Sequence, residues 1–280
     1  MPDKENIAQS AHELHGSDTL DPSIQSLIQS LRSAYLDLML KCLAGTIYED
    51  APSSTLGQKM YDPQLREYGW DWPSVAHTMI GTKRLSNVRT LVESVIGNGI
   101  PGDLIETGVW RGGACIMMRA VLKTYGVTDR RVWLADSFEG LPVPDAESYP
   151  ADADESFHEY AELSVSIEDV KRNFAKYDLL DDQVAFLKGW FKDTLPDAPI
   201  EKLALLRLDG DLYESTIQAL DALYDKVSIG GFVIIDDYHV VAACKQAVHA
   251  FLSTRKLTPE IIEIDGVGVY WQKLSEQAQC

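Results

Sequence analysis

The sequence predicts an α/β protein built on a mostly parallel sheet. Two short apolar runs, 203–208 and 232–235, lack the alternation of a half-exposed strand and therefore fit strands that are buried on both faces. Between them, apolar residues recur at helical spacing from Ile217 to Val227. Near the end of the chain, Asp265-Gly266 separates two further apolar runs, as in a β-hairpin. Together these patterns predict a β-α-β unit followed by an antiparallel pair of strands.

Composition restricts the class of protein. The chain has 280 residues, of which 45% are hydrophobic, enough for a sizeable core in one large or two small domains. Its net charge of −18 argues against nucleic acid and against anionic membrane surfaces as partners. We see no apolar signal segment and no run of membrane-spanning length. The four cysteines have no zinc-site spacing and fit buried thiols in a reducing cytoplasm.

The N-terminal part divides into three segments. Residues 1–20 are polar and are expected to be disordered. Apolar residues at helical spacing over 24–38 predict a helix that packs on the sheet domain or on a second subunit; we expect a homodimer or a higher homo-oligomer. From 48 to 73, aromatic residues alternate with Gly, Pro and acids, which fits either core packing under a long loop or a cover over a pocket. We therefore expect a helical and aromatic-rich cover over 21–82, a catalytic domain over 83–273 and a tail over 274–280.

A glycine-rich turn follows a helix predicted over 85–96. Residues 103–113 read DLIETGVWRGG, a short strand that ends near Glu106 and leads through glycines into a helix from Ala114. Glycines at such a turn let a ligand approach the backbone and the free N–H groups of the helix. The spacing departs from GxGxxG, which disfavours a nicotinamide-dependent dehydrogenase. The Glu-x-Gly-x-x-x-Gly spacing resembles the first motif of class I S-adenosylmethionine-dependent methyltransferases, and a plain turn is the alternative.

The next strand, predicted over 131–136, ends in Asp136, where an acid suits the two hydroxyls of a ribose. The acidic stretch 145–162 that follows is typical of an exposed loop or lid. Its His158 is either a base or, more commonly, a surface histidine.

A helix over 167–177 and a third strand over 184–187 come next. The pair Trp190-Phe191 at the end of this strand flanks an adenine ring or belongs to the core. We favour contact with adenine because of the strand-end position and the preceding acids Asp181-Asp182.

Acids follow both strands of the β-α-β unit. Asp209 and Asp211 follow the first strand, and Asp236 and Asp237 follow the second. Neighbouring parallel strands would bring all four carboxylates to the carboxyl edge of the sheet, where open α/β sheets bind ligands. Like charges raise one another's pKa unless a cation neutralises them, so we expect Mg²⁺, which prefers oxygen ligands. The plainer alternative is that an Asp caps the following helix, but the second acidic pair favours a functional site.

The motifs combine into a resemblance to a known family. WPSVAHTMIGTKRL, DLIETGVWRGGACIMMRAVL, ADSFEGLP, GWFKDTLPDAPI, LRLDGDLYEST and GGFVIIDDYH occur in this order. Together they resemble the macrocin O-methyltransferase family, which includes the mycinamicin and noviose O-methyltransferases. The resemblance covers residues 71–273 and is weaker before them.

The resemblance implies a Rossmann-like class I methyltransferase with a mostly parallel seven-stranded sheet, a C-terminal antiparallel hairpin and an N-terminal helical extension. It implies that a hydroxyl of a deoxysugar on a glycosylated natural product is methylated in antibiotic biosynthesis, with S-adenosylmethionine and Mg²⁺. The metal ligands it implies are Asp209, Asp236 and Asp237, and the general base is Asp211. His239 is our second candidate for the base. Taken with the strand-end residues, the predicted cofactor site comprises Thr78, Met79, Ile80, Glu106, Thr107, Gly108, Arg111, Gly112, Gly113, Asp136, Ser137, Gly140, Asp182, Gly189, Trp190, Phe191 and Asp209.

Two other functions fit parts of the pattern. A vicinal phenol also presents two adjacent oxygens to Mg²⁺, but it would need a narrow apolar slot rather than an aromatic-rich cover. A non-catalytic nucleoside-binding protein would keep the fold without turnover. The four acids argue against it, because a binding module needs no base.

Overall fold

The computed structural model describes residues 21–53, 55, 57 and 59–274. The predicted disordered tail over 1–20 and nearly all of the predicted C-terminal tail lie outside the described residues. The chain forms two compact units, Met1–Leu38 and Met39–Cys280. Residues 39–82, which we assigned to a separate cover segment, therefore belong to the same unit as the sheet.

One seven-stranded sheet organises the larger unit, with the strand order β3-β2-β1-β4-β5-β7-β6. Strands β1 to β5 are parallel, and β7 runs antiparallel to both β5 and β6. This is the predicted α/β fold with a C-terminal antiparallel pair. The strands are β1 Asp103–Thr107, β2 Val132–Asp136, β3 Val184–Lys188, β4 Leu203–Leu208, β5 Val227–Ile235, β6 Ile262–Glu263 and β7 Val269–Gln272.

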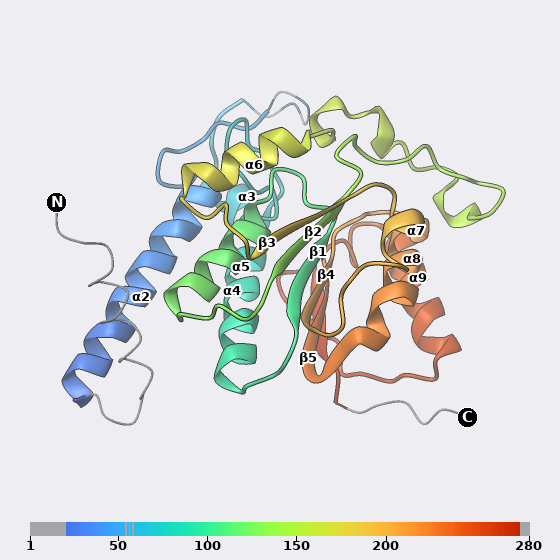
Figure 1. The fold of residues 1–280 in the computed structure, drawn as a ribbon. Coiled ribbons are helices and arrows are strands. Elements are labelled where there is room, and N and C mark those ends of the chain that lie inside the picture. The colour runs from blue at the N-terminus through green and yellow to red at the C-terminus, as the bar shows by residue number, and fades with distance from the viewer. Residues whose placement is uncertain (1–20, 54, 56, 58, 275–280) are drawn as a thin grey trace. The chain divides into compact units, whose positions relative to one another are not determined.

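Helices cover both faces of this sheet. In Figure 1, α4 and α5 lie together on one side, and α8 and α9 lie together on the other. The helices are α2 Pro22–Leu43, α3 Pro63–Tyr68, α4 Gly81–Gly97, α5 Gly113–Thr124, α6 Ile167–Lys176, α7 Phe191–Thr194, α8 Tyr213–Leu223 and α9 Ala242–Thr254. Short 3₁₀ turns are η2 Pro150–Asp152, η3 Phe157–Glu159, η4 Ala161–Leu163 and η5 Tyr224–Lys226. No helix among the described residues is long and apolar enough to cross a membrane.

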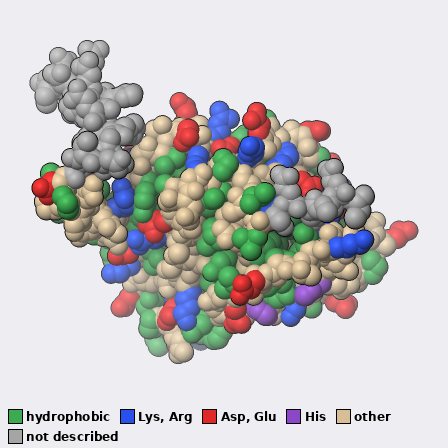
Figure 2. Space-filling model, turned by 90° about the horizontal axis from the view of Figure 1, so that it is seen from below, with side chains coloured by type: hydrophobic (Ala, Val, Ile, Leu, Met, Phe, Trp, Pro, Cys, Tyr) green, Lys and Arg blue, Asp and Glu red, His purple; other side chains and the backbone are tan. Residues whose placement is uncertain are grey.

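Strands β1, β2 and β4 and the end of β5 are almost fully buried on both faces, as expected for parallel strands inside a sheet, whereas β3 is half-buried and β6 is exposed. Leu206 and Val233 pack in one cluster with Leu220 of α8 and Phe251 of α9. All six residues of β4 are buried, including those that point away from this cluster. On the molecular face shown in Figure 2, Lys and Arg side chains are scattered among Asp and Glu without forming a continuous basic area among the described residues.

Two predicted boundaries are wrong. Val227, which we assigned to the end of a helix, begins β5. The helix ends earlier because η5 turns the chain, and β5 then continues through Gly230, whose φ of 86° only glycine adopts readily. The first strand of the predicted hairpin, before Asp265-Gly266, is reduced to Ile262–Glu263, which pair with Tyr270 and Val269 of β7.

The aromatic-rich segment before α4 is organised by a buried arginine. Arg66 is 0% exposed and holds Asp71 through hydrogen bonds of 2.6 to 3.0 Å, and it also donates to the carbonyls of Ala44 and Asp50. A buried charge is tolerated when its donors are satisfied in this way. The segment therefore has a fixed structure with little regular secondary structure.

Candidate functional site

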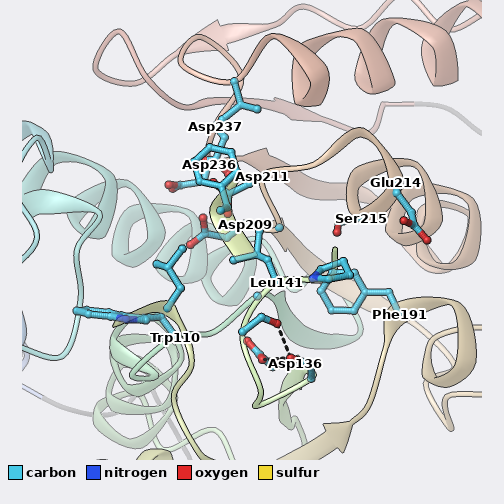
Figure 3. A pocket seen from close by; sticks show the side chains of 18 of the residues that line it. Trp110, Asp136, Leu141, Phe191, Asp209, Asp211, Glu214, Ser215, Asp236 and Asp237 are labelled. Carbon is cyan, nitrogen blue, oxygen red and sulfur yellow. Dashed lines mark hydrogen bonds between the residues drawn. The ribbon is translucent and has the colours of Figure 1, made fainter. Parts of the chain in front are cut away.

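A cavity of about 660 Å³ lies at the carboxyl edge of the sheet. Its wall includes Gly108 after β1, Asp136 at the end of β2, Gly189 after β3, Asp209 after β4 and Asp236 after β5. The carboxyl ends of five neighbouring parallel strands thus contribute to one site, as expected for ligand binding by an open α/β sheet. Figure 3 shows the four acids of the β-α-β unit grouped on one side of the cavity and Asp136 on another.

The parallel register brings the acids together. Leu208 of β4 pairs with Ile235 of β5, so the residues that follow, Asp209 and Asp236, leave the sheet side by side. Backbone hydrogen bonds fix both residues. Asp209 N donates to Thr107 O and Asp236 N donates to Leu208 O, and each N···O distance is 2.9 Å. The two strands of the β-α-β unit are therefore neighbours, as the sequence predicts.

Three of these acids form a candidate metal centre. Asp209, Asp236 and Asp237 each offer a carboxylate oxygen within 4.8 Å of the others. Asp237 Oδ2 is buried and has no hydrogen-bond partner among the described residues. Burial, together with the charges of Asp211, Asp209 and Asp236, raises the pKa of Asp237 well above its usual range. Buried carboxylate oxygens that lack a donor are suitable ligands for a hard divalent cation, so the donor set fits Mg²⁺.

Two buried arginines hold the acids in place. Arg207, which is 0% exposed, donates to Asp209 Oδ2 over 2.7 Å and also pairs with Glu106 and Asp236. Arg84 pairs with the other oxygen of Asp236. Each carboxylate oxygen has two lone pairs, so Asp236 can still bind a cation. Sequence analysis missed both arginines, although Arg207 interrupts an otherwise apolar strand and such a charge needs buried partners.

Asp211, the predicted base, lines the same cavity. Its backbone is left-handed, with φ 56°, which is uncommon for a residue other than glycine. Burial, with added repulsion from Asp209, Asp236 and Glu155, raises its pKa to about 8. In the protein without a metal ion, Asp211 is therefore mostly protonated at neutral pH, and a nearby cation would favour its ionised form.

The opposite wall carries much of the predicted cofactor site. Asp136 accepts hydrogen bonds from Val109 N at 2.7 Å and Phe138 N at 2.6 Å, so both of its oxygens are oriented by the turns around them. A side chain at Gly108 is excluded, because its Cβ would lie 1.8 Å from Asp209 O. The predicted cofactor residues that line the cavity are Met79, Gly108, Asp136, Ser137, Gly140, Gly189, Trp190, Phe191 and Asp209.

Other predicted cofactor residues lie behind this wall. Glu106 is buried with both oxygens engaged, one by Arg207 and the other by the Cys115 thiol at 2.9 Å. Arg111 donates to the carbonyls of Pro73 and Ala76 and lies over the Trp110 ring. None of the following is among the described residues that line the cavity: Thr78, Ile80, Glu106, Thr107, Arg111, Gly112 and Gly113.

Two further predicted site residues are not among the described residues that line the cavity. Asp182 precedes β3, and β3 runs parallel to β2, so Asp182 lies at the amino edge of the sheet, away from the cavity. His239, our second candidate base, is exposed and is not among the described cavity-lining residues, although Asp237 before it and Val240 after it do line the cavity. His158 is likewise exposed, as the surface alternative predicts.

The structure adds wall residues that sequence analysis did not single out as site residues. Trp110, with φ 45°, lines the cavity and donates from its indole nitrogen to Glu162 O over 2.8 Å. Trp70 and Trp72 also line the cavity, so the aromatic-rich segment does contribute to a cover. The first turns of α8 add the polar side chains of Glu214, Ser215 and Gln218.

The sheet order and the carboxyl-edge cavity define a class I methyltransferase fold. A solved structure of the O-methyltransferase NovP has the same fold, with a TM-score of 0.85 and 55% identity over 87% of this chain and 100% of that one. The family model for macrocin O-methyltransferase (TylF) matches residues 38–273.

Characterised relatives agree with this match. Demethyldecarbamoylnovobiocin O-methyltransferase of Streptomyces niveus is 55% identical over 245 residues, which cover 86% of this chain and 94% of that protein. Mycinamicin III 3''-O-methyltransferase of Micromonospora griseorubida is 50% identical over 244 residues, which cover 85% of this chain and 96% of that protein. The chain belongs to the macrocin O-methyltransferase family, as its motifs predict, and it is an O-methyltransferase.

Proposed function

We propose that this enzyme transfers the methyl group of S-adenosylmethionine to a hydroxyl of a sugar, typically a deoxysugar, on a glycosylated natural product, and that it requires Mg²⁺. The observation that carries this proposal is the cavity itself. Asp136 and the Gly108 turn stand on one wall, and Asp211 with the three-carboxylate cluster stands on another. One space would thus hold a nucleoside, a cation and a base, and a binding module would have no need of the base.

On the cofactor wall, Asp136 would accept hydrogen bonds from the ribose hydroxyls, because an acid at the end of the second strand suits that role. The hydrogen bonds from Val109 N and Phe138 N fix the orientation of the Asp136 carboxylate in the cavity wall. Trp190 and Phe191 offer flat apolar surfaces for the adenine ring. Gly108 has no side chain, which lets the turn after β1 approach the backbone of Asp209 closely and so brings the cofactor wall next to the acidic wall.

On the acidic wall, Asp209, Asp236 and Asp237 would hold the metal ion. When bound, Mg²⁺ would act as a Lewis acid toward the acceptor oxygens and lower the pKa of a sugar hydroxyl. Arg207 and Arg84 keep two of the ligands oriented before any cation arrives. Asp211 faces the same space and would accept the proton of the hydroxyl.

The transfer then needs no covalent enzyme intermediate. The acceptor oxygen would form its bond to the methyl carbon as the carbon–sulfur bond breaks, its proton would pass to Asp211, and S-adenosylhomocysteine would leave as the second product. Alignment of the two reactants across the cavity supplies much of the rate enhancement in reactions of this kind.

Two features favour a glycoside over a flat phenol. The cavity is about 660 Å³, and its wall combines the rings of Trp70 and Trp72 with the polar side chains of Glu214 and Gln218. A phenol would instead need a narrow apolar slot. A relative from Streptomyces olivaceus, 53% identical over 257 residues, is named for the 4'-O-methylation of a compound that carries a rhamnosyl sugar, which supports the same choice. We also infer that the enzyme works in the cytoplasm, because Cys42, Cys115 and Cys244 are free thiols.

The experiment is methyl transfer from radiolabelled S-adenosylmethionine to two matched panels, deoxysugar glycosides and catechols, each with Mg²⁺ and with a chelator. We expect label on at least one glycoside, loss of transfer with the chelator and recovery when Mg²⁺ is restored. Transfer to catechols alone would contradict the sugar acceptor. Transfer that persists in the chelator would contradict the metal requirement.

A further inference from the structure

Helix α8, which begins directly after the Asp209–Asp211 loop, lacks a local N-terminal cap. Its N-cap residue is Leu212, with φ −73° and ψ 157°, and no side-chain capping bond is made there. The first N–H groups of a helix have no partner within the helix and need an acceptor from elsewhere. The usual capping side chains are Ser, Thr, Asp and Asn, so leucine at this position leaves that need unmet.

Asp152 meets this need from far away in the chain. Its carboxylate accepts from Tyr213 N over 2.6 Å through Oδ1 and from Glu214 N over 2.9 Å through Oδ2. The two partners lie 61 and 62 positions away in sequence, and Asp152 is 0% exposed. A fully buried carboxylate with both oxygens on the first amides of a helix is a favourable arrangement for a negative charge.

The capped amides stand next to the catalytic loop. Asp211 lies two residues before Tyr213, and its positive φ of 56° is a conformation that the surroundings must enforce. At the β4 end, the loop is held by the hydrogen bond from Asp209 N to Thr107 O, 2.9 Å long. At the α8 end, a turn from Leu212 N to Gly210 O, 2.6 Å long, leads directly into the two amides that Asp152 holds.

The segment that carries Asp152 is itself anchored to the cavity wall. At its near end, Tyr149 packs against Tyr213, with ring centroids 6.1 Å apart. At its far end, Glu162 O accepts from the Trp110 indole over 2.8 Å, and Tyr160 meets Trp72 edge to face. The stretch predicted as an exposed acidic loop thus joins the start of α8 to the cofactor turn, and Asp152 is its buried contact with α8.

We propose that Asp152 is a positioning residue for Asp211. By capping α8 from the acidic segment, it holds Asp211 in the left-handed conformation that aims its side chain into the cavity, while Asp209 is held separately by the β4 end of the loop. This inference rests on the proposed function, because it takes Asp211 as the proton acceptor. A carboxylate displaced by about 1 Å from its productive place can cost on the order of 100-fold in rate.

The test compares Asp152→Ala and Asp152→Asn with a matched control, Asp103→Ala. Asp103 also accepts two hydrogen bonds, from Arg131 N and Trp133 Nε1, each 2.8 Å long, but at the amino edge of the sheet. The measurements are kcat and acceptor KM, Mg²⁺ and S-adenosylhomocysteine affinities by calorimetry, and hydrogen exchange of the Tyr213 and Glu214 amides.

For Asp152→Ala we expect kcat to fall by about 10- to 100-fold. The acceptor KM and both affinities should stay within about threefold of the wild type, as for a group that acts only in the transition state. Exchange at Tyr213 and Glu214 should quicken. Asp152→Asn should recover part of kcat, because its one amide oxygen can still accept from the helix. Asp103→Ala should leave kcat unchanged.

Several results would overturn the inference. One is an Asp152→Ala enzyme that keeps wild-type kcat while Tyr213 and Glu214 exchange quickly. Another is an equal loss of kcat in Asp103→Ala, which would show a general effect of lost stability. If the alanine variant does not fold, the asparagine variant decides, and wild-type kcat with faster exchange would count against the inference. A wild-type enzyme that methylates no glycoside would overturn the proposed function and this inference with it. If the wild-type enzyme does methylate a glycoside, a negative result with the Asp152 variants counts against this inference alone.

Discussion

Arg207 Nη1 donates to Asp209 Oδ2 over 2.7 Å, so a fully buried cation holds the first predicted metal ligand from inside the sheet. The same guanidinium also pairs with Glu106 and Asp236. Arg207 therefore neutralises part of an acidic cluster that would otherwise repel itself. The cluster keeps its geometry without relying entirely on a metal ion.

This relationship predicts the effect of removing the arginine. Arg207→Met would leave three carboxylates without their shared buried cation, and breaking a buried ion pair in this way costs about 3–5 kcal/mol of unfolding free energy. Urea denaturation measures this change. Arg172→Met, at a side chain that is 68% exposed, is the control and should change stability by less than about 0.5 kcal/mol. Equal stabilities for the two variants would show that the Arg207 contacts contribute little.

The cofactor site can be tested through Asp136. Asp136→Ala removes the carboxylate proposed to bind the ribose, and the affinity for S-adenosylhomocysteine should fall by at least about 1 kcal/mol, the scale of a hydrogen bond to a charged group. Calorimetry provides the measurement. Asp182→Ala should bind as the wild type does, since Asp182 lies at the amino edge of the sheet. Unchanged binding by the Asp136 variant would remove that residue from the site.

Stability should depend on pH through Asp211. Burial and the neighbouring acids raise its pKa to about 8 in the folded metal-free protein. The unfolded value is about 3.9, so the folded state binds the proton more tightly, and stability is lost as pH rises between about 4 and 8. Asp211→Asn cannot ionise, so in a chelator it should melt above the wild type at pH 8, with a smaller difference at pH 5.

Calorimetric melting at the two pH values checks this sign. Asp193→Asn, at an exposed position, controls for the loss of one negative charge. If the Asp211 variant melts below the wild type at pH 8, or if the gap is the same at both pH values, ionisation of Asp211 does not destabilise the metal-free protein.

Assembly is predicted from α2. Leu27 and Leu31 are 58% and 62% exposed, and an apolar stripe of this kind is usually buried against a partner. We propose that it packs between subunits and gives at least a homodimer. Light scattering at micromolar concentration should report a dimer for the wild type and a smaller mass for Leu31→Glu. Ser30→Glu, on the same helix, should stay dimeric. A monomeric wild type would refute the proposal.

Much of the fold was predictable because buried parallel strands leave a direct mark in the sequence. Short apolar runs located the end of β5 and also β4, despite the single charge of Arg207, and the parallel register then required Asp209 and Asp236 to emerge together. The wrong assignment of Asp182 came from ignoring direction, since a residue before a parallel strand lies at the amino edge. Val227 was misplaced because its apolar side chain fits a helix face and a strand equally well.

Other parts of the site depend on contacts that no local pattern encodes. Asp152 caps a helix 61 positions away, and nothing in its own segment marks it as different from the neighbouring acids. The pairing of Arg84 with Asp236 joins residues 152 positions apart. Such tertiary contacts become visible only once the strand order brings the segments together.

The central claim is that metal binding and proton transfer belong to different acids in one cluster, and two variants separate them. Asp237→Asn removes a ligand whose Oδ2 has no partner among the described residues, so Mg²⁺ should bind more weakly, and excess Mg²⁺ should restore part of the rate. Asp211→Asn keeps the size of the side chain but cannot take the proton.

The most direct measurement is the single-turnover rate of methyl transfer by Asp211→Asn across a Mg²⁺ titration, with bound cofactor verified by calorimetry. We predict a loss of roughly 10²- to 10⁴-fold, the usual size of a general-base effect, that no concentration of Mg²⁺ recovers. An Asp211→Asn enzyme that transfers methyl at the wild-type rate, or that regains this rate in excess Mg²⁺, would contradict the account.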